Sequence, residues 1–260
     1  MLLQPSQSIE HRRKKILDIL KQKKYISVHN LTKLLFSSEA TIRRDLSELA
    51  DMQLIKKVPG GAIFIEDDKI ENPLHYKEKE NFEKKKYIAQ IAYGLVPEYS
   101  TIFLDSSSTS YIFAKELLKI NNLKIMTYNV YTATLLSQNP TIEVFLPPGK
   151  INPQIGSISN LDTINYIKQY YADLVFLSCR GFDCYYGASD YMEPEAKIKR
   201  CLADQSKKII LLVDSSKLNK QFFFQCMPLN KISIIITDKC LPDDMYKVLE
   251  EKNISVLWEL

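Results

Sequence analysis

The sequence predicts an α/β chain in two parts: a small domain of helices with a β-hairpin, followed by a larger domain built on a mostly parallel sheet. Three observations support this fold class. Residues 1–65 contain helical apolar spacings and one hairpin pattern, residues 66–82 are charged and weakly patterned as in a linker, and residues 83–260 alternate β-branched apolar runs with helical stretches. A chain of 260 residues has room for both domains.

The first domain is predicted to hold three short helices around one small core. Apolar residues at i, i+3 and i+4 spacing predict the first helix from about Ser8 to Lys21. Ser27 can cap a second helix through Asn30–Leu35, and Phe36-Ser37 supplies a turn of the length seen between the paired helices of a helix-turn-helix. Ser38 is a preferred N-cap residue for the third helix.

The third helix is predicted to expose a basic face. Ile42, Leu46 and Leu49 share one stripe of a helical wheel, so we expect them to pack inward. Arg43 and Arg44 lie outside that stripe, where they face solvent or a partner.

A hairpin is predicted to follow the third helix. Residues 54–65 indicate two short strands around Pro59-Gly60-Gly61, because these residues supply the fixed and positive φ angles that a tight reversal needs. Lys56 and Lys57 lie on the first strand. Three helices followed by a basic hairpin are typical of a winged helix-turn-helix.

The charge distribution favours a nucleic-acid partner for this domain. Residues 1–65 hold 12 Lys+Arg and 6 Asp+Glu, a net charge of +6, whereas the rest of the chain holds 23 and 25, a net charge of −2. Clustered lysine and arginine attract phosphates, so we predict binding to a double-stranded DNA operator; the alternative is a solvated charge cluster without a partner. The side chains expected to contact DNA are Ser38, Thr41, Arg43, Arg44, Ser47, Lys56 and Lys57. Because one recognition helix reads only a few base pairs, a homo-oligomer, either a dimer or a tetramer, is expected.

Composition argues against several other classes of protein. No apolar run approaches the roughly 18 residues of a membrane helix, and the N-terminus lacks the long apolar core of a secretory signal. We therefore expect a cytoplasmic protein without a membrane partner. Five cysteines at irregular spacing and three histidines indicate neither a disulfide framework nor a metal site, and no cofactor is expected.

The second domain alternates predicted strands with predicted helices. The apolar runs that indicate strands are Thr101–Leu104, Leu123–Met126, Ile142–Leu146, Leu174–Leu177, Ile209–Val213, Ile232–Ile236 and Ile254–Trp258. The helical stretches lie around Thr109–Lys119, Tyr131–Ser137, Glu195–Gln205 and Pro242–Glu250. Continuous apolar strands separated by helices indicate a buried parallel sheet that is covered on both faces.

Three of these strands end in an acid, namely Asp105, Asp214 and Asp238. Open α/β sheets bind ligands outside the carboxyl ends of their strands. A Ser/Thr run over residues 106–110 follows Asp105 and offers hydroxyls and helix N-terminal N–H groups to an anion, and Lys217 adds a positive charge after Asp214. These features predict a site for a phosphorylated, hydroxyl-rich small molecule. The alternative is that serine and aspartate simply cap the helices that follow strands.

With these motifs in place, the chain resembles the deoxyribose-operon repressor (DeoR) family of bacterial transcription regulators over nearly its whole length. The first-domain signature is Thr41-Ile42-Arg43-Arg44-Asp45-Leu46 with Gly60-Gly61-Ala62 at the right distance. In the second domain the matches are Leu104-Asp105 with its Ser/Thr loop, Ala172-Asp173, Gly181-Phe182-Asp183, Gly187, Glu195 with Lys199-Arg200, Asp214-Ser215-Ser216-Lys217 and Ile236-Thr237-Asp238.

The resemblance implies a winged helix-turn-helix joined to a sensor domain that resembles sugar-phosphate isomerases and binds a phosphorylated sugar or related metabolite. Such a protein regulates transcription of carbohydrate-metabolism genes, and a repressor is expected. The residues implied to bind the effector are Asp105, Ser106, Ser107, Ser108, Thr109, Tyr128, Asp183, Lys199, Asp214 and Lys217.

The departures from the family pattern cluster in the ligand loops. Ser107 stands where the family has a glycine, and a serine adopts positive φ less easily. Tyr128 stands where an asparagine is usual, and Pro148–Asn152 replaces a Gly-Gly run with a following arginine. The sequence therefore leaves open an unusual effector, or a regulator that has lost metabolite sensing.

A sugar-phosphate isomerase with an added basic domain is the alternative from another class. Asp105, Asp183, Asp214 and Lys217 could serve as its acid and base. No residue is demanded by catalysis rather than by binding, and a shared fold does not transfer chemistry, so we do not expect an enzyme.

Overall fold

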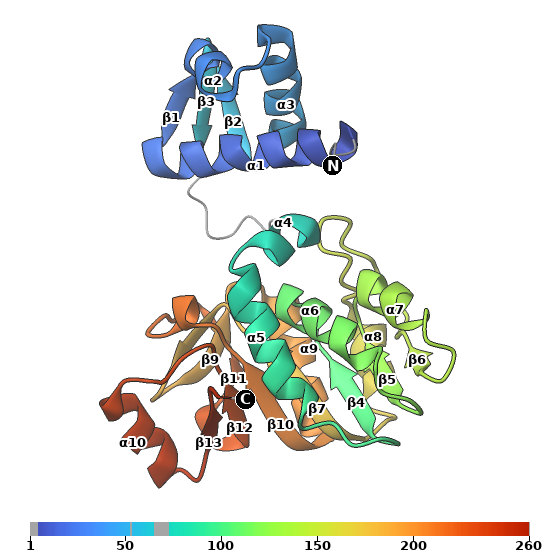
Figure 1. Ribbon diagram of the computed structural model, residues 1–260. Coiled ribbons are helices and arrows are strands. Elements are labelled where there is room, and N and C mark those ends of the chain that lie inside the picture. The colour runs from blue at the N-terminus through green and yellow to red at the C-terminus, as the bar shows by residue number, and fades with distance from the viewer. Residues whose placement is uncertain (1–4, 53, 65–72, 260) are drawn as a thin grey trace. The chain divides into compact units, whose positions relative to one another are not determined.

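The computed structural model describes residues 5–52, 54–64 and 73–259 and is shown in Figure 1. Contacts within the chain divide it into two compact units, Met1–Tyr76 and Lys77–Leu260. We describe each unit by itself.

The described part of the first unit contains three helices and a small antiparallel sheet. The helices are α1 (Pro5–Lys23), α2 (Val28–Leu35) and α3 (Glu39–Asp51), and the strands are β1 (Tyr25–Ser27), β2 (Ile55–Val58) and β3 (Gly61–Phe64), in the order β1-β3-β2. The three predicted helices and the hairpin are therefore confirmed. Strand β1 was not predicted, because three residues are too few to show an alternating pattern.

The core of the first unit forms where the apolar faces of the helices meet the sheet. The predicted stripe of α3, formed by Ile42, Leu46 and Leu49, is at most 2% exposed and packs with Leu20 and Leu31.

The two glycines of the hairpin serve different purposes. Gly60 has a φ of +75°, which glycine adopts without strain. At Gly61, a Cβ would lie 2.4 Å from the backbone oxygen of Ile26, so the pairing of β3 with β1 requires the absence of a side chain.

The larger unit is organised by a seven-stranded sheet within the residues that the structure describes. Its parallel strands follow the order β13-β12-β10-β7-β4-β5-β6. Their bounds are β4 (Thr101–Leu104), β5 (Lys124–Thr127), β6 (Glu143–Phe145), β7 (Ala172–Ser178), β10 (Ser206–Leu212), β12 (Ile234–Ile236) and β13 (Ser255–Leu257). All seven correspond to predicted strands, which confirms the α/β class.

Helices cover both faces of this sheet (Figure 1). One face packs against α5 (Phe82–Tyr93), α6 (Ser108–Leu117) and α7 (Val130–Leu136), and the other against α8 (Leu161–Ile167), α9 (Glu193–Asp204) and α10 (Asp243–Glu251). Successive strand residues alternate between the two cores; Ile102 and Leu104 lie in one and Phe103 in the other. Burial on both faces explains the continuous apolar runs of the sequence.

A second, smaller sheet in this unit was not predicted. Strands β8 (Gly181–Asp183), β9 (Gly187–Asp190) and β11 (Phe224–Met227) pair antiparallel in the order β11-β9-β8. These strands are three or four residues long, and β8 and β9 contain glycine, so no alternating pattern marks them in the sequence.

The stretch 66–82, predicted as a linker, includes regular structure. It contains α4 (Leu74–Lys79) and the first residue of α5, and its residues 66–72 lie outside the described part of the chain. Within residues 5–52, 54–64 and 73–259, no helix combines the length and apolarity that crossing a bilayer requires.

Candidate DNA-binding surface and effector site

The start of α3 is set by Ser38. Its side chain accepts a hydrogen bond of 3.2 Å from the backbone N–H of Thr41, and the two hydroxyl oxygens lie 2.8 Å apart. Ser38 is exposed, and Thr41 is half-buried. The cap thus fixes the helix start while both hydroxyls remain close to its outer surface.

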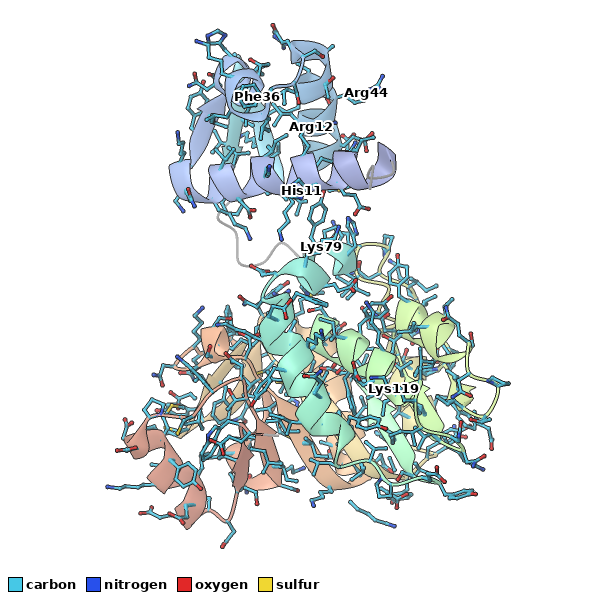
Figure 2. The ribbon with its side chains drawn as sticks, in the orientation of Figure 1. His11, Arg12, Phe36, Arg44, Lys79 and Lys119 are labelled. Atoms are coloured by element: carbon cyan, nitrogen blue, oxygen red, sulfur yellow. The ribbon has the colours of Figure 1, made fainter. Side chains whose placement is uncertain are left out.

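The two arginines of α3 differ in their surroundings. Arg43 donates to Glu39 Oε1 through its Nε, at 3.0 Å, and through a terminal nitrogen, at 2.5 Å. Such an exposed i,i+4 pair is worth only about 0.3 to 0.5 kcal/mol, so a phosphate can replace it easily. Arg44 is exposed and projects away from the core of its unit (Figure 2), and no carboxylate of the described residues pairs with it.

The wing contributes to the same surface. Lys57 on β2 donates from its Nζ to Ser47 Oγ at 2.9 Å, and Ser47 in turn donates to the backbone oxygen of Arg43 at 3.0 Å. Lys56 is also exposed. The structure therefore places Arg43, Ser47 and Lys57 together, with the first strand of the wing beside α3.

A buried carboxylate holds α3 against α1. Asp45 is 1% exposed, and its two oxygens accept from the Nε atoms of Arg12 at 2.5 Å and Arg13 at 3.0 Å. Sequence reasoning missed this role, because Asp45 was noted only as part of a motif. Two of the basic residues counted as attracting DNA are therefore already paired within the domain.

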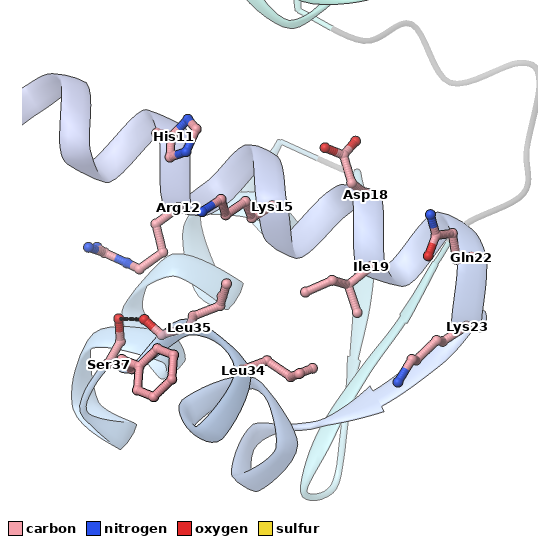
Figure 3. Close-up of a pocket in the computed structure, with 11 residues that line it drawn as sticks. His11, Arg12, Lys15, Asp18, Ile19, Gln22, Lys23, Leu34, Leu35 and Ser37 are labelled. Carbon is pink, nitrogen blue, oxygen red and sulfur yellow. Dashed lines mark hydrogen bonds between the residues drawn. The ribbon is translucent and has the colours of Figure 1, made fainter.

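The first unit also contains a groove between α1 and α2. Its volume is about 640 Å³, and its lining includes Arg12, Lys15, Ile19 and Leu34 (Figure 3). Phe36 lies at its edge, 96% exposed, with a left-handed backbone at φ 48° and ψ 44°. Among bulky side chains this backbone conformation is rare.

In the larger unit, the predicted effector loops meet where the strand order changes direction. From β4 the chain moves to β5 and β6 on one side and then returns to β7 on the other side, so the carboxyl ends of β4 and β7 form the crevice where such sheets bind ligands. Asp105 follows β4 and accepts from the backbone N–H of Ser178, at the end of β7, at 2.7 Å.

Asp105 organises these loops from a fully buried position. Besides Ser178, it accepts from the backbone N–H of Ser107 at 3.0 Å and from Ser110 Oγ at 2.6 Å. Ser107 caps α6 with a φ of −72°. The backbone strain expected for a serine at a position where the family has glycine is therefore not present. Asp105 thus shapes the Ser/Thr loop from beneath.

A second buried carboxylate, Glu195, lies at the start of α9. Its Oε2 accepts from Ser106 Oγ at 2.7 Å and from the Tyr128 hydroxyl at 2.9 Å. Its Oε1 is buried without a hydrogen-bond partner among the residues that the structure describes. Burial, together with the Glu195 carboxylate, raises the pKa of Tyr128 well above its ordinary value. Tyr128 is therefore a neutral hydroxyl of this cluster.

Lys199 is buried between carboxylates rather than open to the crevice. Its Nζ lies 2.8 Å from Asp190 Oδ2 and 3.8 Å from Asp105 Oδ2. Burial acts to lower the pKa of Lys199, but Asp190 and Asp105 outweigh it and raise this pKa well above the ordinary value. This charge joins α9 to β9 and to the loop that follows β4.

Lys217 is the more accessible cation at the strand ends. Its Nζ donates to Ser178 Oγ at 2.9 Å and lies 3.7 Å from Asp214 Oδ2, with the Lys217 side chain 18% exposed. Asp214 is buried and accepts from the backbone N–H and the hydroxyl of Ser216. Burial acts to raise the pKa of Asp214, but Lys217 and the contacts from Ser216 outweigh it, so the carboxylate stays ionised.

Two other predicted effector residues stand apart from these contacts. The Oδ1 of Asp183 accepts from the backbone N–H groups of Tyr185 and Tyr186 at 2.8 and 3.1 Å, so this carboxylate closes the turn between β8 and β9. Thr109 is 1% exposed in the first turn of α6, and its Oγ1 has no partner in the described part of the chain.

Sequence reasoning missed Lys85, which reaches the same loops from α5. It is 4% exposed, and its Nζ donates to Ser108 Oγ at 2.9 Å. The available signal was its register: Lys85 shares an i, i+3, i+4, i+7 stripe with Ile88, Ala89 and Ala92, which are all buried. A lysine in such a stripe indicates a buried cation.

These two surfaces and the fold define a DNA-binding transcriptional regulator with a separate sensor domain. The DeoR C terminal sensor domain matches residues 80–239, and the DeoR-like helix-turn-helix domain matches residues 12–68. The chain therefore belongs to the DeoR family, as its motifs predicted.

Relatives of known name cover nearly the whole chain. The HTH-type transcriptional regulator GolR of Listeria innocua is 34% identical over 94% of this chain and 96% of its own length. The glycerol-3-phosphate regulon repressor of Escherichia coli is 29% identical over 93% of this chain and 95% of its own length. A ribose 5-phosphate isomerase from Methanocaldococcus jannaschii is similar in structure, at a TM-score of 0.40 and 19% identity, over 53% of this chain and 55% of the isomerase.

Proposed function

We propose that this protein binds its operator as a homo-oligomer through α3 and the wing, and that a phosphorylated sugar or polyol at the strand ends of the larger unit controls this affinity. The DNA half of the proposal is supported by the exposed Arg44 on the helix whose Ser47 accepts from the wing residue Lys57. Arginine can read guanine in the major groove while lysine neutralises nearby phosphates.

The observation that supports the effector best is the unpartnered Oε1 of Glu195. A buried carboxylate oxygen without a donor is costly, and a ligand hydroxyl would satisfy it. Lys217, in the loop that follows β10, supplies the positive charge that binds a phosphate. Relatives named for a glycerol-3-phosphate regulon support a small phosphorylated polyol or sugar.

We propose further that the site binds its ligand without converting it. Two of the carboxylates that an isomerase would use as acid or base are already engaged: Asp105 accepts three hydrogen bonds, and Asp183 closes a turn. Asp214 is buried beside Lys217. Purified protein is expected to leave ribose 5-phosphate and glycerol 3-phosphate unchanged.

The test is DNase footprinting on the DNA that flanks the protein's own gene, with and without these two phosphates. We expect a protected region that contains two half-sites and that weakens when one of the phosphates is added. Lys217→Ala should keep the protection and lose the response, whereas Lys220→Ala, an exposed lysine of the same loop, should keep both. If no sequence is protected, the proposal that the protein binds an operator is refuted. If a sequence is protected but neither phosphate changes the protection, control by these metabolites is refuted.

A further inference from the structure

The segment that leads into the sensor domain contacts several of its strand-end loops. Asn81 precedes α5 but does not cap it; its Nδ2 donates instead to Ser216 Oγ at 3.1 Å. Lys84 donates to Ser215 Oγ at 2.8 Å and lies 3.8 Å from Asp238 Oδ2. The junction of α4 and α5 is therefore fastened to the loops that follow β10 and β12.

Lys85 extends these contacts to the loop that follows β4. Its Nζ donates to Ser108 Oγ and to the backbone oxygen of Lys77, in the last turn of α4. An ammonium group has three N–H donors, so one is left for a further acceptor. This one side chain joins the predicted effector loop to α4.

The ammonium group of Lys85 forms no ion pair within the part of the chain that the structure describes. No carboxylate of the described residues lies at ion-pair distance from its Nζ, although the residue is 4% exposed. Burying an ammonium group is costly unless an anion accompanies it. Burial and the positive charge of Lys217 lower the pKa of Lys85 to about 8, so two cations act on the same region. An anionic ligand between them would relieve both effects.

We propose that Lys85 binds the anionic group of the effector directly, and that this contact draws its Nζ away from Lys77 and loosens α4. Because α4 lies where the chain enters the sensor domain, its release changes the connection to the DNA-binding domain. The ion pair of Glu78 with Lys115 on α6 would still join α4 to the sensor domain. This inference rests on the proposed function, since it concerns the same ligand.

The test compares Lys85→Met with Lys86→Met, because Lys86 is the exposed neighbour on the same helix. The probes are glycerol 3-phosphate, ribose 5-phosphate and inorganic phosphate, with glycerol and ribose as uncharged controls, and binding is measured by calorimetry on the full chain. For the phosphorylated probe that wild type binds, we expect Lys85→Met to raise Kd about tenfold or more. Lys86→Met should leave Kd unchanged, and Lys85→Arg should restore part of the affinity.

Hydrogen exchange on the same samples tests the transmission step. In wild type, the bound probe should speed hydrogen exchange of the amides in α4. In Lys85→Met, the probe bound at the same fractional occupancy should leave the exchange rate of these amides unchanged. Replacement of an unpaired buried ammonium by an apolar side chain of similar length should not unfold the protein. Equal Kd for Lys85→Met and wild type would overturn the inference and leave the proposed effector intact. If wild type binds none of the probes, metabolite sensing itself fails.

Discussion

The Nζ of Lys57 on the wing lies 2.9 Å from the Oγ of Ser47 on α3, and Ser47 is one turn beyond Arg43. This contact fixes the wing beside the exposed face of the helix. A lysine placed this way can exchange its serine partner for a phosphate when α3 enters a groove, because a neutral hydroxyl is a weaker acceptor than an anion. Roles for individual side chains follow from this arrangement.

Arg44→Ala is expected to reduce sequence preference. A bidentate contact of arginine with guanine supplies about 1 to 3 kcal/mol of discrimination, and no carboxylate among the described residues would have to release Arg44 first. The measurement is the ratio of Kd values for operator and random duplex at fixed salt. If Arg44→Ala weakens both duplexes equally, Arg44 contacts phosphate rather than a base.

Lys57→Ala should instead weaken binding to operator and random DNA by the same factor. Loss of one phosphate contact lowers the slope of log K against log salt by about 1. Fluorescence anisotropy at salt concentrations from about 50 to about 200 mM measures this slope. Lys24→Ala, at an exposed lysine directly before β1, provides a control with the same change of net charge. An unchanged slope for Lys57→Ala would remove the wing from the interface.

Asp45→Asn is expected to destabilise the DNA-binding domain. The substitution removes the negative charge that accepts from both Arg12 and Arg13, and hydrogen bonds to charged groups contribute about 1.5 to 3 kcal/mol. Partial exposure of both arginines keeps the loss near the lower value. Urea unfolding followed by circular dichroism measures it, with the exposed Asp51→Asn as control. Equal midpoints for the two variants would show that the buried pairs contribute nothing.

Phe36→Asn is expected to stabilise the same domain by about 1 kcal/mol. Non-glycine residues pay roughly 1 to 2 kcal/mol in the left-handed conformation, whereas asparagine visits it more readily. Phe36 is 96% exposed, so the substitution removes little buried area. Leu34→Asn, within α2, should not stabilise. If Phe36→Asn raises the unfolding midpoint but weakens DNA binding, the exposed ring contributes to the complex.

Effector affinity is expected to fall as the pH rises through about 8. Lys85 binds an anion only when protonated. Burial and the positive charges of Lys217 and Arg180 lower its pKa to about 8, although Asp214 and Glu80 act in the opposite direction. Phosphate monoesters are already dianionic above about pH 7, so the trend reports the protein. Calorimetric titrations between about pH 7 and pH 9 measure it, and Lys85→Met should give a flatter profile.

The unliganded protein should show the opposite trend in stability. In the unfolded chain the lysine pKa returns to 10.5, so the unfolded state binds more protons between about pH 8 and this value. The contribution of Lys85 to the free energy of unfolding therefore rises as the pH rises through that window. The difference between wild type and Lys85→Met isolates this contribution.

Much of the fold could be predicted from local pattern. The stripe of Ile42, Leu46 and Leu49 reports a period of 3.6 residues, and the apolar runs from Thr101–Leu104 onward report strands buried on both faces. Short elements such as β1 and the β8–β9–β11 sheet were missed, because three or four residues carry no measurable period. The partners of β1 and β11, which are β3 and β9, also lie far away in sequence.

The sequence by itself determined which residue types stand at the helix start and at the strand ends: Ser38 before α3, and Asp105 and Asp214 after β4 and β10. Caps and strand ends are local, so neighbouring residues suffice to predict them. Only the tertiary structure decided what these groups do. Packing turned Asp105 inward as the support of a loop, left one oxygen of Glu195 without a donor, and brought Lys85 from α5 to Ser108. Burial and long-range contact set the charge and the hydrogen bonds of these side chains, and neither is written in the spacing of residues along the chain.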